Sequence, residues 1–144
     1  PLGRTIYTDG WDGYAAARAR LLQTIRESGP RNVLALGGDV HQNVAAHLRE
    51  RPNEPDSPVV ACEFVTTSVT SRGMGAAALD RIRSSNPDIV HARSDERGFT
   101  LVELSPQQAT ATFCTTPFPA RAGASLGVQA RYAVAHGNAA LQTA

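Results

Sequence analysis

Two side chains that can bind metal ions, Asp39 and His41, follow a short apolar run with one residue between them. A carboxylate oxygen and an imidazole nitrogen are common metal ligands in proteins. The run, residues 32–36, ends at Gly37-Gly38, and an apolar run bounded by turn formers is typical of a buried strand. On extended chain, a two-residue spacing points both side chains to the same side. The pattern therefore predicts a pair of metal ligands beyond a strand end, where open α/β sheets place their chemistry.

A helix must lead into this strand. Apolar residues recur at spacings of three and four before it, which predicts an amphipathic helix whose buried stripe is Tyr14, Ala17, Leu21, Leu22 and Ile25. Gly29-Pro30 ends the helix, because glycine suits the position just past a helix and proline cannot continue one. A helix followed by a buried strand is half of an α/β unit.

The remainder of the chain predicts further strands and one more helix. Residues 44–48 fit a strand or a helix, and we favour a strand, because a ligand loop between two strands closes tightly. Alternating residues and a proline turn predict a β-hairpin over 98–114. The other expected elements are a strand at 59–65, a hydroxyl-rich loop at 66–71, a helix at 73–85, a Pro/Gly/Ala linker at 116–126 and a final edge strand formed by 128–134 and a short end piece.

The composition is that of a globular protein with a core. The chain has 144 residues, 42% of them hydrophobic, and a formal net charge of +1, so no general attraction to nucleic acid is implied. No run approaches the roughly 18 apolar residues of a membrane span. Cys62 and Cys114 stand on separate expected strands and leave two alternatives, a pair of free thiols or one bridge.

Several separate motifs in this order closely resemble the C-terminal part of PhoD-like alkaline phosphatases, which are calcineurin-like metallophosphoesterases. The resemblance covers about residues 5–115 and is carried by Asp9 to Tyr14, Asn32 to His41, Glu63 to Ser71, Asn86-Pro87 and Arg97-Gly98-Phe99. It implies an α/β fold: the C-terminal part of a metallophosphoesterase β-sandwich flanked by helices, with a C-terminal β-hairpin. Residues 1–117 would belong to that domain, and 118–144 would be a linker and terminal edge strand.

The resemblance implies a secreted or cell-envelope phosphomonoesterase or phosphodiesterase that uses iron(III) and calcium. His41 would bind the iron-side metal and Asp39 the calcium-side metal, and a metal-activated hydroxide would attack phosphorus. The superfamily's other metal motifs would lie upstream, so the chain resembles about the last third of such an enzyme. We therefore expect its partners to be a phosphate ester and a missing N-terminal half, and the isolated chain to be inactive.

Substrate contacts are expected from Asn43, Trp11, Tyr14 and Arg97. For three of these residues a structural role is the alternative: Asn43 would hold its loop, Tyr14 would lie in the core, and arginines such as Arg97 are mostly solvated. Asp12 could cap the helix. The sequence departs from the family pattern at two positions, with Asp88 where histidine often follows Asn-Pro, and Phe99 where tyrosine is common.

Two classes of function remain open at this stage. The first is a metallophosphoesterase segment whose other ligands lie upstream. The second is a catalytically inactive α/β binding or structural domain that keeps the same fold. A set of Asp, His, Cys and Asn ligands in the preceding sequence would favour the enzyme.

Overall fold

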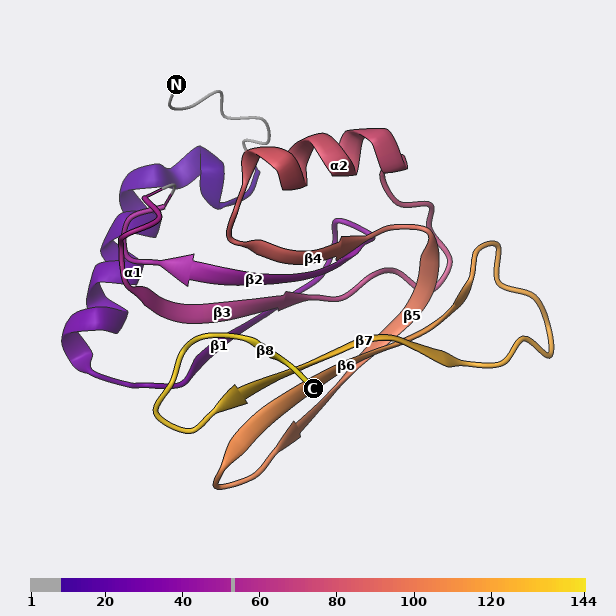
Figure 1. Cartoon of the computed structure of the whole chain (residues 1–144). Coiled ribbons are helices and arrows are strands. Elements are labelled where there is room, and N and C mark those ends of the chain that lie inside the picture. The colour runs from indigo at the N-terminus through magenta and orange to yellow at the C-terminus, as the bar shows by residue number, and fades with distance from the viewer. Residues whose placement is uncertain (1–8, 53) are drawn as a thin grey trace.

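Two four-stranded β-sheets pack face to face, with both helices on the outer side of the first sheet (Figure 1). The computed structural model describes residues 9–52 and 54–144. This arrangement confirms the predicted sandwich flanked by helices.

The first sheet contains β1 (Val33–Gly37), β2 (Asn43–Arg49), β3 (Val59–Val65) and β4 (Ile89–Arg93), in the order β1-β3-β2-β4. β1 and β3 are parallel, and β2 is antiparallel to both β3 and β4. β1, β3 and β4 therefore run in the same direction. The loops that follow these three strands lie at one edge of the sheet, and that edge carries the candidate site.

The predicted strands at 32–36, 44–48 and 59–65 correspond to β1, β2 and β3, whereas β4 was not predicted. Asn86-Pro87 indicated only a chain break, and the five residues of β4 are too few to show a clear alternation. The strand forms because its residues pair with β2, so Val44 opposes Ala92 and Asn43 opposes Arg93. A contact between distant segments, rather than local propensity, creates this strand.

A single-turn helix, η1 (Trp11–Tyr14), precedes α1 (Ala15–Ser28), and α2 (Ala76–Ser85) follows β3. α1 ends at Gly29 with a φ of 76°, the left-handed cap that the sequence predicts. The stripe predicted for α1 was wrong in part: Leu22 is buried, but Leu21 is 44% exposed and Tyr14 is 60% exposed. The reason is that α1 rests on the sheet mainly along β3, so only a narrow face is covered. Among the described residues, neither helix combines the length and apolar character needed to cross a bilayer.

The second sheet is an antiparallel meander of β5 (Glu96–Leu104), β6 (Gln108–Pro117), β7 (Gly127–Ala135) and β8 (Gln142–Thr143). The predicted hairpin is confirmed, and it extends from 96 to 117. The strand predicted at 128–134 is β7. The short end piece is β8, which pairs along the outer side of β7 and forms the edge of the sheet.

The core between the sheets centres on Phe113. Its ring is fully buried and packs edge-to-face against Phe64 and Tyr132, with centroid distances of 6.4 and 6.5 Å, and stacks on His91 at 5.4 Å. Such aromatic contacts add to the free energy gained by burying the rings. A second cluster, which includes Val44 and Leu79, packs α2 against the outer face of the first sheet.

Cys62 belongs to the main core, and both cysteines are free thiols, which decides between the two alternatives. Burial raises the pKa of the Cys62 thiol to about 12, so this thiol stays protonated and behaves as a small apolar side chain.

His47 on β2 ties the C-terminal segment to the first sheet. Its Nε2 accepts a hydrogen bond from the backbone N–H of Leu141 at 3.0 Å, so this imidazole is neutral and carries its proton on Nδ1. Burial lowers the pKa of His47 from its ordinary value of 6.5; the charge of Asp88 opposes that shift and the charge of Arg49 adds to it.

The substitution Phe113→Ala should lower the free energy of unfolding by about 3–5 kcal/mol, because it removes a buried ring and leaves a cavity. Phe99→Ala is the matched control, since Phe99 lies on the neighbouring strand and is 47% exposed. Urea denaturation monitored by circular dichroism measures both. Equal losses for the two variants would contradict the assignment of Phe113 to the core.

Acidification should destabilise the fold through His47. The unfolded imidazole binds a proton near pH 6.5, whereas the folded one does so only at lower pH, so the unfolded state holds more protons in that window. The free energy of unfolding should therefore fall as pH decreases through the window. In His47→Leu, the free energy of unfolding measured by urea denaturation should depend less on pH. The dependence that remains would come in part from His91, because burial also lowers the pKa of His91. Superimposable profiles for the parent chain and His47→Leu would show that the expectation is wrong.

Candidate functional site

Asp39 and His41 lie in the loop between β1 and β2, at the carboxyl edge of the first sheet. The loop is not extended: Asp39 has a φ of 71° and His41 a φ of 56°, both in the left-handed region. The argument that extended spacing aligns the two side chains was therefore wrong. Gly37 and Gly38 do not adopt positive φ; the two candidate ligands carry that conformation themselves. Such positions cost about 1–3 kcal/mol each and concentrate at functional sites.

The imidazole of His41 is held in one tautomer. Its Nδ1 lies 3.1 Å from the backbone carbonyl oxygen of Arg72. A carbonyl oxygen can only accept, so Nδ1 carries a proton and donates, and in the neutral ring Nε2 then keeps its lone pair. Metal-binding histidines are oriented in this way by a partner on the other ring nitrogen. His41 is thus prepared to bind a metal ion through Nε2.

The carboxylate of Asp39 is exposed, and within residues 9–52 and 54–144 no hydrogen bond or ion pair engages it. A carboxylate oxygen and an imidazole nitrogen from residues two apart in one loop fit a mixed metal site, because calcium prefers oxygen ligands and iron accepts imidazole. The described part of the chain brings no third His, Cys, Asp or Glu close enough to complete a cluster. The residues present fit part of a metal-binding donor set.

Arg97, expected to contact substrate, is 1% exposed and lies behind this loop. Its Nη1 donates to the carbonyl oxygen of His41 at 3.0 Å and to Oγ1 of Thr67 at 2.5 Å, and its Nη2 donates to the carbonyl oxygen of Ser94 at 2.6 Å. The guanidinium carbon lies 4.9 Å from the ring centroid of Phe118. These contacts give Arg97 a supporting role in the loop; its contact with substrate stays a prediction.

Gly73 lies where the loop after β3 crosses the loop after β1. A Cβ at this position would fall 2.4 Å from the carbonyl oxygen of His41 and 3.1 Å from Cβ of Ser94. No side chain fits there without a shift of the backbone. Glycine therefore allows residues 72–74 to pass closely enough for the carbonyl of Arg72 to reach the His41 ring.

Asn43 is 1% exposed and connects the loops to both sheets. Its Oδ1 accepts from the N–H of Thr67 at 2.9 Å, and its Nδ2 donates to Oε1 of Gln129 at 3.1 Å. Gln129 in turn donates to Glu96 at 2.6 Å and lies 3.0 Å from Nε2 of His91. The structural alternative for Asn43 accounts for these bonds; its contact with substrate stays a prediction.

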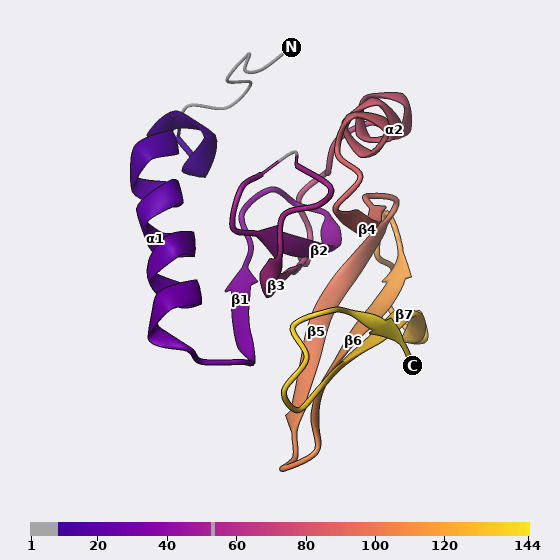
Figure 2. The same ribbon diagram turned by 60° about the vertical axis from the view of Figure 1, so that its left-hand side comes forward.

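Trp11 and Tyr14 are 53% and 60% exposed on η1. α1 and β1 run antiparallel side by side, so η1 lies at the end of the helix that points toward the carboxyl end of β1 (Figure 2). The contact of these two aromatic side chains with substrate stays a prediction. Tyr14 is not a core residue, and Asp12 does not cap the helix but pairs with Arg18 at 3.3 Å.

Asp88 and Phe99, the two departures from the family pattern, lie in different parts of the fold. Asp88 accepts a hydrogen bond from Nε of Arg49 at 2.6 Å, and this ion pair joins the start of β4 to the end of β2. Phe99 lies on the outer face of the second sheet, away from the core.

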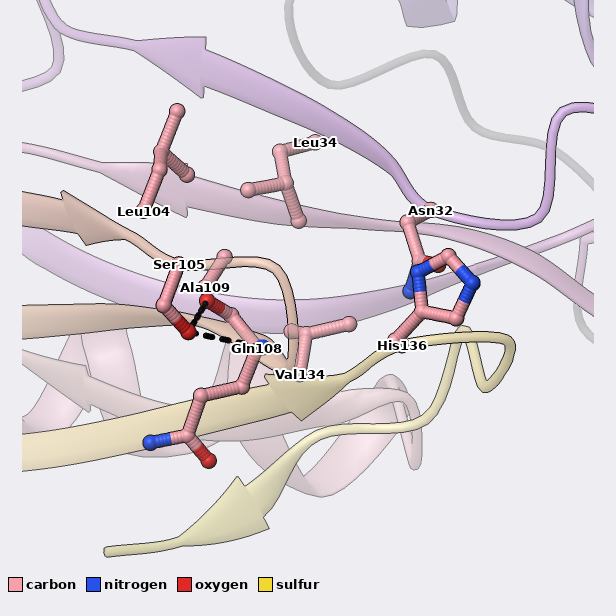
Figure 3. A pocket seen from close by; sticks show the side chains of 8 residues that line it. All are labelled: Asn32, Leu34, Leu104, Ser105, Gln108, Ala109, Val134 and His136. Atoms are coloured by element: carbon pink, nitrogen blue, oxygen red, sulfur yellow. Dashed lines mark hydrogen bonds between the residues drawn. The ribbon is translucent and has the colours of Figure 1, made fainter.

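A shallow pocket between the sheets lies elsewhere. It is lined by Leu34, Val134, His136 and neighbouring residues, with Asn32 at its rim (Figure 3). Asn32 immediately precedes β1, whereas Asp39 follows it, so the pocket is at the opposite end of that strand. It contains neither candidate ligand and is not part of the site.

Residues 3–113 match the model of the PhoD-like phosphatase family. The chain belongs to this family. It is 37% identical over 131 residues to alkaline phosphatase D of Bacillus subtilis (strain 168), an alignment covering 88% of this chain and 22% of that protein. A solved structure titled "Structure of PhoD" superposes with a TM-score of 0.84 and 34% identity over 94% of this chain and 26% of that chain. This PhoD-like chain thus spans about a quarter or less of the length of these relatives.

Two residues of the candidate site, Gly73 and Phe118, were not singled out from the sequence. Gly73 carried a signal, since glycine is frequent in loops that approach ligands or other backbone. Phe118 carried none, because it lies in a Pro/Gly/Ala-rich stretch far along the chain from His41. Only the folded structure places its ring over Arg97.

Gly73→Ala should lower the free energy of unfolding by about 1–3 kcal/mol, as expected for overpacking. The new Cβ would press on the His41 carbonyl and loosen the bond between the ring and Arg72. Gly75→Ala is the control, because nothing lies within 4 Å of a Cβ built there. Urea denaturation gives the energies. Equal effects of the two substitutions would contradict the close approach at Gly73.

Proposed function

We propose that this chain supplies the last metal-binding loop of a metal-dependent phosphoric ester hydrolase of the alkaline phosphatase D type, acting on phosphomonoesters or phosphodiesters. Membership of the PhoD-like phosphatase family supports the reaction class. The observation that carries the proposal is the His41 imidazole, whose Nδ1 donates to the Arg72 carbonyl, in the same loop as the exposed Asp39.

His41 would hold an iron(III) ion through Nε2, and Asp39 would hold a calcium ion through its carboxylate. When bound, such ions stabilise charge developing on a phosphoryl group and lower the pKa of attacking water. The chain's own contribution is orientation. The Arg72 carbonyl fixes which nitrogen of His41 is available, and the buried loop contacts hold its backbone in place.

A phosphate ester is the proposed substrate. Trp11 and Tyr14 are exposed at the end of α1 that points toward the carboxyl edge, where they could contact the organic part of the ester. A longer protein of which this chain is one segment would supply the remaining metal ligands. We propose that this longer protein is secreted or located in the cell envelope.

A chimera tests the proposal directly. The segment of Bacillus subtilis alkaline phosphatase D that aligns with this chain is replaced by residues 1–144, and hydrolysis of p-nitrophenyl phosphate is followed with and without a chelator. We expect metal-dependent activity. Asp39→Ala and His41→Ala should each lower kcat/KM by about 100-fold or more, and Asp56→Ala, in an exposed loop, should have little effect. A folded, metal-loaded chimera without activity would contradict the proposal.

The chain by itself should hydrolyse p-nitrophenyl phosphate no faster than buffer. Two donors cannot fill the coordination shell of calcium, which takes six to eight oxygens, and the described residues offer no larger cluster. Release of p-nitrophenol by residues 1–144 is measured with added calcium and iron. Turnover that disappears in His41→Ala would show that the chain assembles a site by itself.

A further inference from the structure

We propose that Arg97 is a positioning residue that fixes the direction of the His41 imidazole by holding the backbone carbonyl of His41. The inference rests on the proposed function only in taking His41 as a metal ligand. The contacts themselves do not depend on that function.

The guanidinium of Arg97 joins three loops at the carboxyl edge of the first sheet. Its acceptors are His41 from the loop after β1, Thr67 from the loop after β3, and Ser94 from the turn after β4. A planar guanidinium donates along fixed directions, so the bonds from Nη1 and Nη2 hold the three loops in one arrangement, while Nε has no hydrogen-bond partner among the described residues. The carbonyl of His41 is one of these fixed points.

Burial makes this arrangement obligatory. Arg97 is 1% exposed, and its hydrogen bonds within the described structure go to two carbonyls and one hydroxyl, none of them to a carboxylate. A buried cation without such acceptors is strongly unfavourable. Movement of the His41 carbonyl would leave Nη1 with only the hydroxyl of Thr67, so the backbone of His41 is held against relaxation out of the left-handed region.

His41 is held at two points, its backbone carbonyl and its imidazole ring. Its carbonyl accepts from Arg97 and its Nδ1 donates to the carbonyl of Arg72, so backbone and side chain are both tied. A Cβ at position 73 would fall 2.4 Å from the carbonyl oxygen of His41 and 3.2 Å from Nη2 of Arg97, so glycine leaves the room that this arrangement needs. Loss of the first bond releases the peptide and removes the alignment that the second requires.

Phe118 covers this cluster. Its ring centroid lies 4.9 Å from the guanidinium carbon of Arg97 and 5.8 Å from that of Arg72. An aromatic face stabilises a neighbouring cation and excludes water from it. Phe118 directly follows β6 of the second sheet, so the packing of the two sheets reaches the His41 loop through Arg97.

The test measures the tautomer of His41 in the metal-free chain by 15N NMR, in the parent and in Arg97→Lys. Lysine keeps the charge but not the fork of donors. In the parent, His41 should be the Nδ1–H form. In Arg97→Lys we expect loss of that preference, toward the Nε2–H form that free histidine favours. His47 also carries its proton on Nδ1, for an unrelated reason, and is the internal control.

Arg93→Lys is the matched control variant, because Arg93 is an exposed arginine at the same turn and pairs with Asp95. It should leave His41 unchanged. If Arg97→Lys does not fold, Thr67→Val decides, since it keeps the arginine but removes the hydroxyl that, with the His41 carbonyl, fixes the direction of Nη1; a smaller shift of the His41 tautomer in the same direction is expected. Unchanged His41 signals in a folded variant, or equal changes at His41 and His47, would overturn the inference. The tautomer of His41 is measured in the metal-free chain, so an inactive chimera, which would contradict the proposed function, would not change the outcome of this test.

Discussion

The candidate site depends on the burial of one positive charge. Arg97 is enclosed by loops and an aromatic ring, and its hydrogen bonds go to carbonyl and hydroxyl oxygens of segments far apart in sequence. Since a buried cation must keep its acceptors, those segments are locked together. The left-handed backbone of His41, the close passage of Gly73 and the cover supplied by Phe118 all lie around this charge.

The sheet topology brings these segments within reach of the guanidinium. β1, β3 and β4 point in one direction, so the loops that follow them meet at a single edge. The aromatic core around Phe113 fixes the second sheet against the first. The chain from Asn43 through Gln129 to Glu96 then spans the two sheets with hydrogen bonds next to the candidate loop. Packing and polar contacts together give that loop a rigid base.

Sequence reasoning succeeded where the signal is local. The apolar runs of β1 and β3, the hairpin over 98–114 and the Gly29 cap follow from residue periodicity and turn chemistry, and the motif order indicated the PhoD-like family. It was wrong where a partner decides the outcome. β4 exists because it pairs with β2, and Tyr14 is exposed because α1 meets the sheet along a narrow face.

The same division holds for the site. The sequence by itself determined the candidate ligands, Asp39 and His41, because a carboxylate and an imidazole after a strand end are chemically recognisable in one dimension. The tertiary structure decided which nitrogen of His41 is available and that Arg97 supports the loop from within. Both depend on atoms 31 to 56 residues away along the chain. Residue types specify which ligand atoms are present, whereas long-range hydrogen bonds fix how those atoms are oriented. Those bonds form only after the sheets have packed.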